Sequence, residues 1–165
     1  MANKVIIIMG VSGSGKTTVG ELLSEKTGWP FYDADTFHSK GNIDKMKAGI
    51  PLTDEDRWPW LDKMNAFAAT QLGSGSIILA CSALKEMYRQ HLCKGIDKNC
   101  CFIFLKGDYD TIINRLQNRQ QHYMPATLLR SQFDTLEEPT GAITVDIVQP
   151  TETIVEQIIT AISKN

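Results

Sequence analysis

The segment from Gly10 to Thr17, with the sequence GVSGSGKT, is the feature that most constrains how this 165-residue chain can fold. It places two glycines five positions apart and follows the second with lysine and threonine, which is the phosphate-loop pattern. Glycine backbones can turn successive N–H groups inward around a phosphate, the lysine adds a positive charge, and the threonine hydroxyl is a ligand for Mg²⁺. The pattern predicts a nucleoside triphosphate site, and its expected contact residues are Gly10, Val11, Ser12, Gly13, Ser14, Gly15, Lys16, Thr17 and Thr18.

The residues on either side have the pattern that a phosphate loop requires. Residues 5–9 (VIIIM) form an apolar, β-branched run that is typical of a strand buried on both faces. A helical pattern follows from about Thr17 to Lys26, so the loop would open onto the positive end of a helix. A Gly/Ser-rich loop without a ligand is the alternative, and the complete motif between strand and helix argues against it.

Composition limits the classes of protein to which the chain can belong. Hydrophobic residues make up 42% of it, which indicates a globular protein, and its length favours a single domain over residues 1–165. The net charge of −2 gives no general electrostatic reason to bind nucleic acid. No stretch is long enough to cross a membrane, and the four cysteines lack CxxC spacing. We therefore expect a cytoplasmic protein with neither a nucleic-acid nor a membrane partner.

Apolar runs alternate with helical patterns along the whole chain. This alternation predicts an α/β fold in which a five-stranded parallel sheet is covered by helices on both faces. The expected strands are residues 5–9, 31–33, 76–81, 101–105 and 143–147. The expected helices are residues 17–26, a short helix within 36–49, 59–72, one from about 85, one from 108, 126–136 and one from 151.

Two carboxylates, Asp33 and Asp35, follow the second expected strand. In a continuing strand they would point the same way, at the edge where open α/β sheets bind ligands. We assign Asp35 to accepting a proton from a substrate hydroxyl and Asp33 to reaching Mg²⁺ through water. The third strand ends without an acidic residue, so the metal would depend on Thr17, phosphate oxygens and Asp33. A solvated acidic turn is the alternative, and the position after the second strand favours the site.

Arg57 is the first candidate for binding an acidic acceptor, within an expected substrate-binding segment of about residues 36–72. It lies between a turn that Thr53 caps and a helix whose first turn we expect to contain Pro59. Its planar guanidinium is well shaped for a bidentate contact with a carboxylate. Lys85 and Arg89 after the third strand are a second possibility, and a solvated helix face is the alternative for Arg89.

Arg115 and Arg119 lie one turn apart near the end of an expected helix. A small kinase needs a mobile basic lid that excludes water and neutralises the transferred phosphate, and residues 115–126 could supply it. A basic helix end that complements the helix dipole is an equal alternative. Which arginine would contact the base and which the phosphates is open.

Several segments together resemble the gluconate kinase family, small relatives of the shikimate and adenylate kinases. The matching residues cover nearly the whole chain in order and are 9–17 (MGVSGSGKT), 33–35 (DAD) with His38 and Asn42, 54–57 (DEDR), 59–61 (PWL), 81–85 (CSALK), 105–108 (LKGD), 122–124 (HYM), 131–133 (SQF), 135–139 (TLEEP), 146–147 (DI) and 149–150 (QP). Many families share the phosphate loop, whereas the SALK and QF…LEEP segments are more specific to this family.

The resemblance implies a three-layer P-loop kinase fold with a small lid and, commonly, a homodimer. It also implies transfer from ATP, with Mg²⁺, to the 6-hydroxyl of D-gluconate. We expect Lys16, Asp35 and Arg119 to be catalytic. Beyond the loop, we expect Arg115 and Arg119 to contact the nucleotide, and the resemblance adds Gln149 and Pro150. His38 and Asn42 could bind acceptor hydroxyls.

Two other functions fit part of the sequence. A kinase for another small hydroxy acid, such as shikimate, would use the same phosphate loop and acid pair. The SALK segment argues against it, because the segment after the third strand in shikimate kinases looks Gly-rich. A nucleotide-dependent switch fits less well, since the Asn-Lys-x-Asp guanine signature is missing and the acid pair would have no role.

Overall fold

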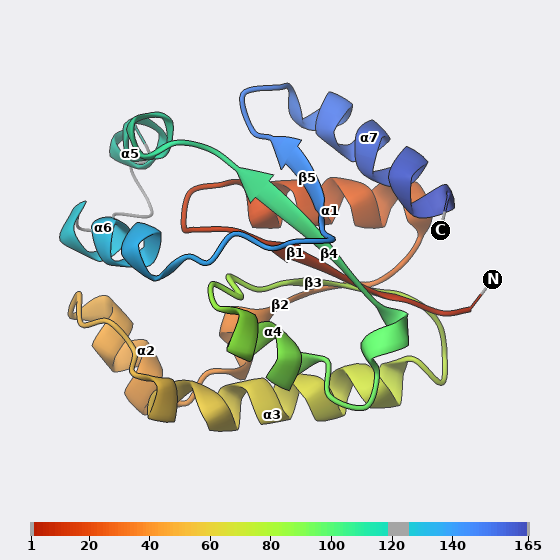
Figure 1. The fold of residues 1–165 in the computed structure, drawn as a ribbon, viewed down its shortest axis with the longest axis horizontal. Coiled ribbons are helices and arrows are strands. Elements are labelled where there is room, and N and C mark those ends of the chain that lie inside the picture. The colour runs from red at the N-terminus through yellow and green to blue at the C-terminus, as the bar shows by residue number, and fades with distance from the viewer. Residues whose placement is uncertain (1, 119–125, 165) are drawn as a thin grey trace.

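The computed structural model describes residues 2–118 and 126–164, and the strands within them form one parallel sheet (Figure 1). The strand order is β2-β3-β1-β4-β5, so the first strand lies in the middle. The strands are β1 (Val5–Met9), β2 (Phe31–Asp33), β3 (Ile77–Ala80), β4 (Cys100–Lys106) and β5 (Ile143–Asp146). The five expected strands and their parallel arrangement are confirmed.

Helices cover both faces of the sheet (Figure 1). On one face α1 (Lys16–Thr27) packs beside α7 (Thr151–Ser163), and on the other α3 (Asp54–Gln71) packs beside α4 (Glu86–Leu92). The other helical segments are the 3-10 helices η1 (Ala34–Phe37) and η2 (Asp97–Asn99) and the α-helices α2 (Lys40–Lys47), α5 (Tyr109–Gln117) and α6 (Ala126–Thr135). Across the described part of the chain, no helix is both long and apolar enough to cross a membrane.

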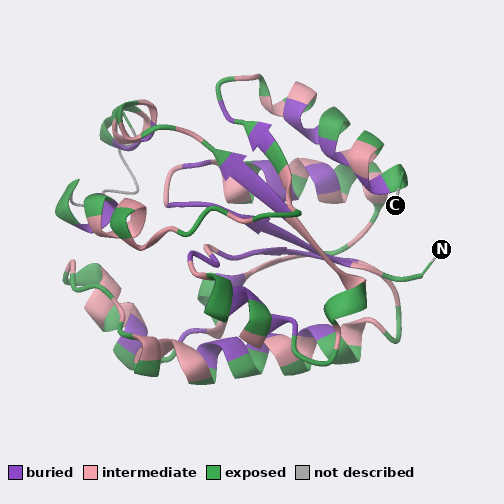
Figure 2. Cartoon of the chain, viewed as in Figure 1, coloured by how far each residue is buried: buried purple, intermediate pink, exposed green. Residues whose placement is uncertain are grey.

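The central strands are buried because their side chains alternate between two apolar clusters. Ile6 and Ile8 of β1 pack on the side of α1 and α7, whereas Val5, Ile7 and Met9 pack on the side of α3 and α4. Figure 2 shows the central strands β1 and β3 as buried and the outer faces of the helices as exposed. A strand covered on both faces is apolar at every position, which is the pattern that residues 5–9 predicted.

The carboxyl ends of β1, β2 and β3 meet at one edge of the sheet. β1 pairs with β3 on one side and β4 on the other, and open α/β sheets bind ligands where the strand order reverses in this way. The loop after β1 contacts the segment after β3, because Gly10 N donates to the Ser82 carbonyl oxygen at 3.3 Å. The fold therefore brings the phosphate loop beside the ends of β2 and β3.

α3 begins earlier than the sequence indicated. Thr53 and Asp56 form a capping box, in which each side chain accepts a hydrogen bond from the other residue's backbone N–H. The helix is continuous from Asp54, so the expectation that Pro59 lies in its first turn was wrong. The capping box fixes the start of the helix, and the buried residue Trp60 holds the helix against the sheet despite the missing N–H of Pro59.

Candidate active site

The phosphate loop turns sharply between β1 and α1. Gly10 has a φ of 150°, and a Cβ atom there would lie 3.0 Å from the Leu105 carbonyl oxygen. Gly15, with a φ of 100°, is the N-cap residue of α1, so the unpaired N–H groups of that helix face the loop. Lys16 Nζ donates to the carbonyl oxygens of Gly10 and Val11 at 3.0 Å each. The lysine ammonium therefore lies across the anion-binding loop.

Asp33 and Asp35 lie beside this loop. Thr17 Oγ1 is 3.5 Å from Asp33 Oδ2, and Asp33 Oδ1 accepts a hydrogen bond from Asp35 N at 2.9 Å. We had expected the two carboxylates to point the same way because the strand would continue to Asp35, but β2 ends at Asp33. Asp33 instead caps η1, which starts at the next residue. Burial and the Asp33 carboxylate raise the pKa of Asp35, against an opposing effect of Lys16. A raised pKa makes the Asp35 carboxylate a better proton acceptor than an ordinary aspartate.

Two cavities meet at the phosphate loop. The larger, of about 710 Å³, is lined by loop residues, by Asp33 of the expected metal site and by the expected acceptor-site side chains Asp35, His38, Arg57 and Lys85. The smaller, of about 380 Å³, is lined by the expected nucleotide-site side chains Arg115 and Gln149. Gly15 and Thr18 line both cavities. A triphosphate along the loop can therefore connect a base in the smaller cavity to an acceptor in the larger.

His38 reaches the larger cavity, and Asn42 lies behind it. Asn42 Nδ2 is 3.2 Å from His38 Nδ1 and donates to the Asp56 carbonyl oxygen at 2.8 Å. Burial, followed by the charge of Arg57, lowers the pKa of His38 to about 4. The ring is therefore neutral near pH 7, and because Nδ1 accepts from the amide, Nε2 carries the proton. Asn42 is not among the residues that line the cavity.

Arg57 and Tyr88 belong to a charged cluster in the larger cavity. The guanidinium carbon of Arg57 lies 5.0 Å from the centroid of the Tyr88 ring, and Nη2 donates to the Leu52 carbonyl oxygen at 3.3 Å. Arg57 Nε is buried and has no hydrogen-bond partner among the described residues. Lys85 Nζ lies 3.3 Å from Asp54 Oδ1, which also accepts from the Tyr88 hydroxyl. The Tyr88 bond lowers the pKa of Asp54, whereas burial raises the pKa of Tyr88 to about 12.

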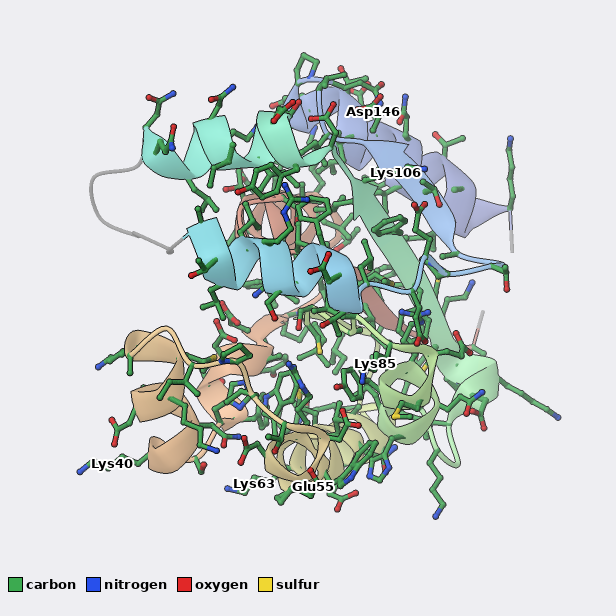
Figure 3. All side chains as sticks on the ribbon, turned by 60° about the vertical axis from the view of Figure 1, so that its left-hand side comes forward. Lys40, Glu55, Lys63, Lys85, Lys106 and Asp146 are labelled. Atoms are coloured by element: carbon green, nitrogen blue, oxygen red, sulfur yellow. The ribbon has the colours of Figure 1, made fainter. Side chains whose placement is uncertain are left out.

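Lys85 and Arg89 are one turn apart but have different surroundings. Figure 3 shows Lys85 between α6 and the α3–α4 pair. Arg89 is only 3% exposed, and its guanidinium donates to the carbonyl oxygens of Ala83 at 2.6 Å and Glu137 at 2.9 Å. It does not line the cavity, and it does not face solvent. Arg89 therefore supports the segment that carries Lys85, because these loop carbonyls need buried donors.

The nucleotide side contains two of the four residues expected there. Arg115 and Gln149 line the smaller cavity. Pro150 is the N-cap residue of α7 and is not among the lining residues. Arg119 and most of the expected lid fall within residues 119–125, outside the described part of the chain. Their roles stay predictions from the sequence.

The sequence did not single out three residues that line the larger cavity, namely Asp54, Tyr88 and Gln132. Asp54 lies in the DEDR segment of the family resemblance without an assigned role, and nothing in the sequence around Tyr88 indicates a site residue. Gln132 of α6 contacts Ser12 of the phosphate loop, a contact between residues 120 positions apart. The available signal for Gln132 was its place in the SQF segment of the family resemblance.

The site combines an anion-binding loop, a carboxylate of raised pKa and fixed cations, which suits phosphoryl transfer to a hydroxyl. Within residues 2–118 and 126–164, no cluster of three or more His, Cys, Asp and Glu side chains could hold a metal ion. Thr17 and Asp33 nevertheless provide oxygen atoms beside the loop. This donor set fits Mg²⁺, which usually takes few protein ligands and completes its shell with phosphate oxygens and water.

Comparisons with known proteins extend this assignment. Residues 12–163 match the family model described as shikimate kinase. The thermosensitive gluconokinase of Escherichia coli is 43% identical over 162 residues, which cover 95% of this chain and 86% of that protein. A gluconokinase of Arabidopsis thaliana is 40% identical, with coverage of 100% and 95%. The crystal structure of a gluconokinase from Sinorhizobium meliloti superimposes with a TM-score of 0.90 at 40% identity, covering 99% and 93% of the two chains.

The family model and the relatives match the same long stretch of this chain and are all small-molecule kinases by name. The family model spans most of the chain, and the curated relatives align over nearly the full length of both partners. The chain therefore belongs to the P-loop kinases that the shikimate kinase model describes and, among them, to the gluconokinase family.

Proposed function

We propose that the protein transfers the γ-phosphoryl group of ATP to the 6-hydroxyl of D-gluconate. The observation that carries this proposal is that one cavity contains the phosphate loop, the Asp35 carboxylate and the Arg57 guanidinium. A linear sugar acid has a reactive hydroxyl at one end and a carboxylate at the other, so it matches a cavity with a proton acceptor and a separate cation. The relatives named as gluconokinases support the same acceptor.

The chemical step needs little covalent participation from the protein. Lys16 and the loop N–H groups bind the phosphate oxygens and stabilise charge as it develops. The acceptor oxygen forms a bond to the γ-phosphorus while the bond from that phosphorus to the β–γ bridging oxygen breaks. Asp35 takes the hydroxyl proton, and the products are a phosphate ester and ADP. The raised pKa of Asp35 suits this role.

Mg²⁺, when bound, supplies positive charge that neutralises the β- and γ-phosphates. Thr17 would contribute its hydroxyl to the ion, and Asp33 would reach it through water. Arg115 and Gln149 would contact the nucleoside end from the smaller cavity, which they line.

The acceptor would be held at both of its ends. Arg57 has a buried Nε without a hydrogen-bond partner among the described residues, and a carboxylate can accept from that Nε and a terminal nitrogen together. Lys85 adds positive charge, partly offset by its contact with Asp54. His38 Nε2–H can donate to an acceptor hydroxyl, and Asn42 acts through His38 because it lies behind the ring.

The two alternatives have less support. A shikimate kinase would use the same loop and acids, but the curated relatives at 40–43% identity are named as gluconokinases. A switch protein would leave the acceptor cavity and its cations without a role.

Identification of the product tests the proposal. The protein is incubated with ATP, Mg²⁺ and D-gluconate, and ³¹P NMR follows the γ-phosphate, with Lys16→Met as the control for contaminating activity. We expect a phosphate monoester coupled to a CH₂ group, formed in equal amount to ADP. Inorganic phosphate without an ester would contradict the proposal, as would an ester on another carbon.

We propose a homodimer from the family resemblance, and the cytoplasmic location stays an expectation from the composition. Light scattering after size-exclusion chromatography tests the first, and a monomeric mass would contradict it.

A further inference from the structure

Gln132 of α6 makes a two-point contact with Ser12 of the phosphate loop. Gln132 Oε1 accepts a hydrogen bond from the Ser12 backbone N–H at 2.7 Å, and Gln132 Nε2 donates to the Ser12 hydroxyl at 3.2 Å. The orientation of the amide is determined by this geometry, because only its oxygen can accept from an N–H. A side chain from a distant helix thus holds one backbone N–H of the anion-binding loop.

The position of Ser12 along the loop defines which end of a nucleotide this contact affects. Ser12 lines the larger, acceptor-side cavity and is not among the residues that line the smaller one. Ser14 lines the smaller cavity, and Gly15 lines both. A triphosphate that runs from the nucleoside cavity to the acceptor cavity therefore has its γ-phosphoryl group on the side of the loop that contains Ser12 and Gly13.

Gln132 projects from a firmly held helix. Leu129 of α6 is fully buried in the core. The residues after α6 are tied to the segment after β3, since Glu137 N donates to the Leu84 carbonyl oxygen at 2.8 Å and Arg89 donates to the Glu137 carbonyl. That segment continues into Lys85 of the acceptor cavity. Through Gln132, the Ser12 end of the loop is fixed relative to the acceptor side of the site.

We propose that Gln132 is a positioning residue for the γ-phosphoryl end of the nucleotide and acts through Ser12. This inference rests on the proposed phosphoryl transfer but not on the identity of the acceptor. The β-phosphate is held by N–H groups at the start of α1, where Gln132 makes no contact, so ADP binding does not depend on the amide. The γ-phosphoryl group lies at the Ser12 end of the loop, and the conformation of that end depends on the hydrogen bonds from Gln132.

The test compares two nucleotides in the absence of acceptor. Isothermal titration calorimetry measures the Kd of Mg·ADP and of a β,γ-imido ATP analogue for the wild type, Gln132→Ala and Gln132→Glu. Asp134→Ala, an exposed position on the same helix, is the matched control. Gln132→Glu keeps the size of the side chain and therefore preserves the measurement if the alanine variant fails to fold.

Gln132→Ala is expected to leave the Kd of ADP within about twofold and to weaken the analogue by about three- to tenfold, the equivalent of one net hydrogen bond. Gln132→Glu is expected to lose analogue affinity selectively, because its charge lies near the γ-phosphate. kcat falls for both variants while the KM for the acceptor is unchanged. Ser12→Ala, which retains the backbone contact, is expected to have the smaller effect.

Equal weakening of both nucleotides, or no change in either, would overturn the inference and leave Gln132 with a general structural role. The outcome is separable from that of the proposed function. If the Gln132 variants lose affinity for the ATP analogue only, but the wild type forms no gluconate ester, the proposed acceptor is refuted and the positioning role of Gln132 stands.

Discussion

The imidazole of His38 lies flat against the indole of Trp60, with ring centroids 4.0 Å apart and planes 15° from parallel. The indole is itself fixed, because Trp60 Nε1 donates to the Ala34 carbonyl oxygen at 2.7 Å. The stack joins the segment after β2 to α3 and holds His38 at the acceptor cavity. Its surroundings disfavour the imidazolium, so His38 serves as a neutral hydrogen-bond partner.

The neutral state of His38 predicts a pH dependence of stability. The pKa of His38 is lowered from 6.5 to about 4 in the folded protein, so the unfolded chain binds a proton first as pH falls. The free energy of unfolding should therefore decrease as the pH falls between these two values. Above pH 6.5 the ring is neutral in both states, so His38 contributes no pH dependence there. His38→Gln has no titrating group and should show a shallower decrease in this window. Urea unfolding across the window measures both, and parallel curves would exclude this role for His38.

Asp35→Asn tests the proton acceptor. We expect kcat to fall by about 10²–10⁴-fold, the usual range for general-base catalysis. Because burial and Asp33 raise the pKa of Asp35, the charged carboxylate is disfavoured in the fold, and the melting temperature should not decrease. Steady-state kinetics and thermal unfolding are compared with Asp44→Asn, an exposed acid on α2. A variant that keeps its kcat and changes only the KM for ATP would show that the role is wrongly assigned.

Arg89→Met distinguishes support of the site from substrate contact. Removing the buried guanidinium leaves the Ala83 and Glu137 carbonyls without their donor, so the free energy of unfolding should fall by about 2–4 kcal/mol. Lys94→Met, at an exposed position just after α4, is the control. Denaturant unfolding and the KM for gluconate are both measured. Unchanged stability with a raised KM would return Arg89 to the acceptor site.

The parts of the molecule that the sequence predicts are those determined locally. Every residue of β1 is buried, so its apolar run directly indicates a central strand. The phosphate loop is a contiguous motif whose residue types each have a physical reason. Asp33 and Asp35 were found because both follow one strand, although a helix cap, rather than strand alternation, brings them together.

The parts that the sequence did not predict depend on distant contacts or on competition between local signals. The sequence placed Arg89 either in the acceptor site or on a solvated helix face, whereas the fold buries its guanidinium against backbone carbonyls. The contact of Gln132 with Ser12 has no local signal. Pro59 is typical of a first helical turn, but the capping box that starts at Thr53 determines where α3 begins.

The measurement that most directly tests the account is ADP release with D-gluconate, D-glucose and shikimate as acceptors, for the wild type and Arg57→Lys. We predict turnover with gluconate and very poor turnover with glucose, because an uncharged acceptor leaves the Arg57 guanidinium without its partner. Arg57→Lys should lose much of the affinity for gluconate, since an ammonium cannot reproduce the planar fork. Equal rates on glucose and gluconate would contradict the carboxylate anchor, and preference for shikimate would contradict the proposed acceptor.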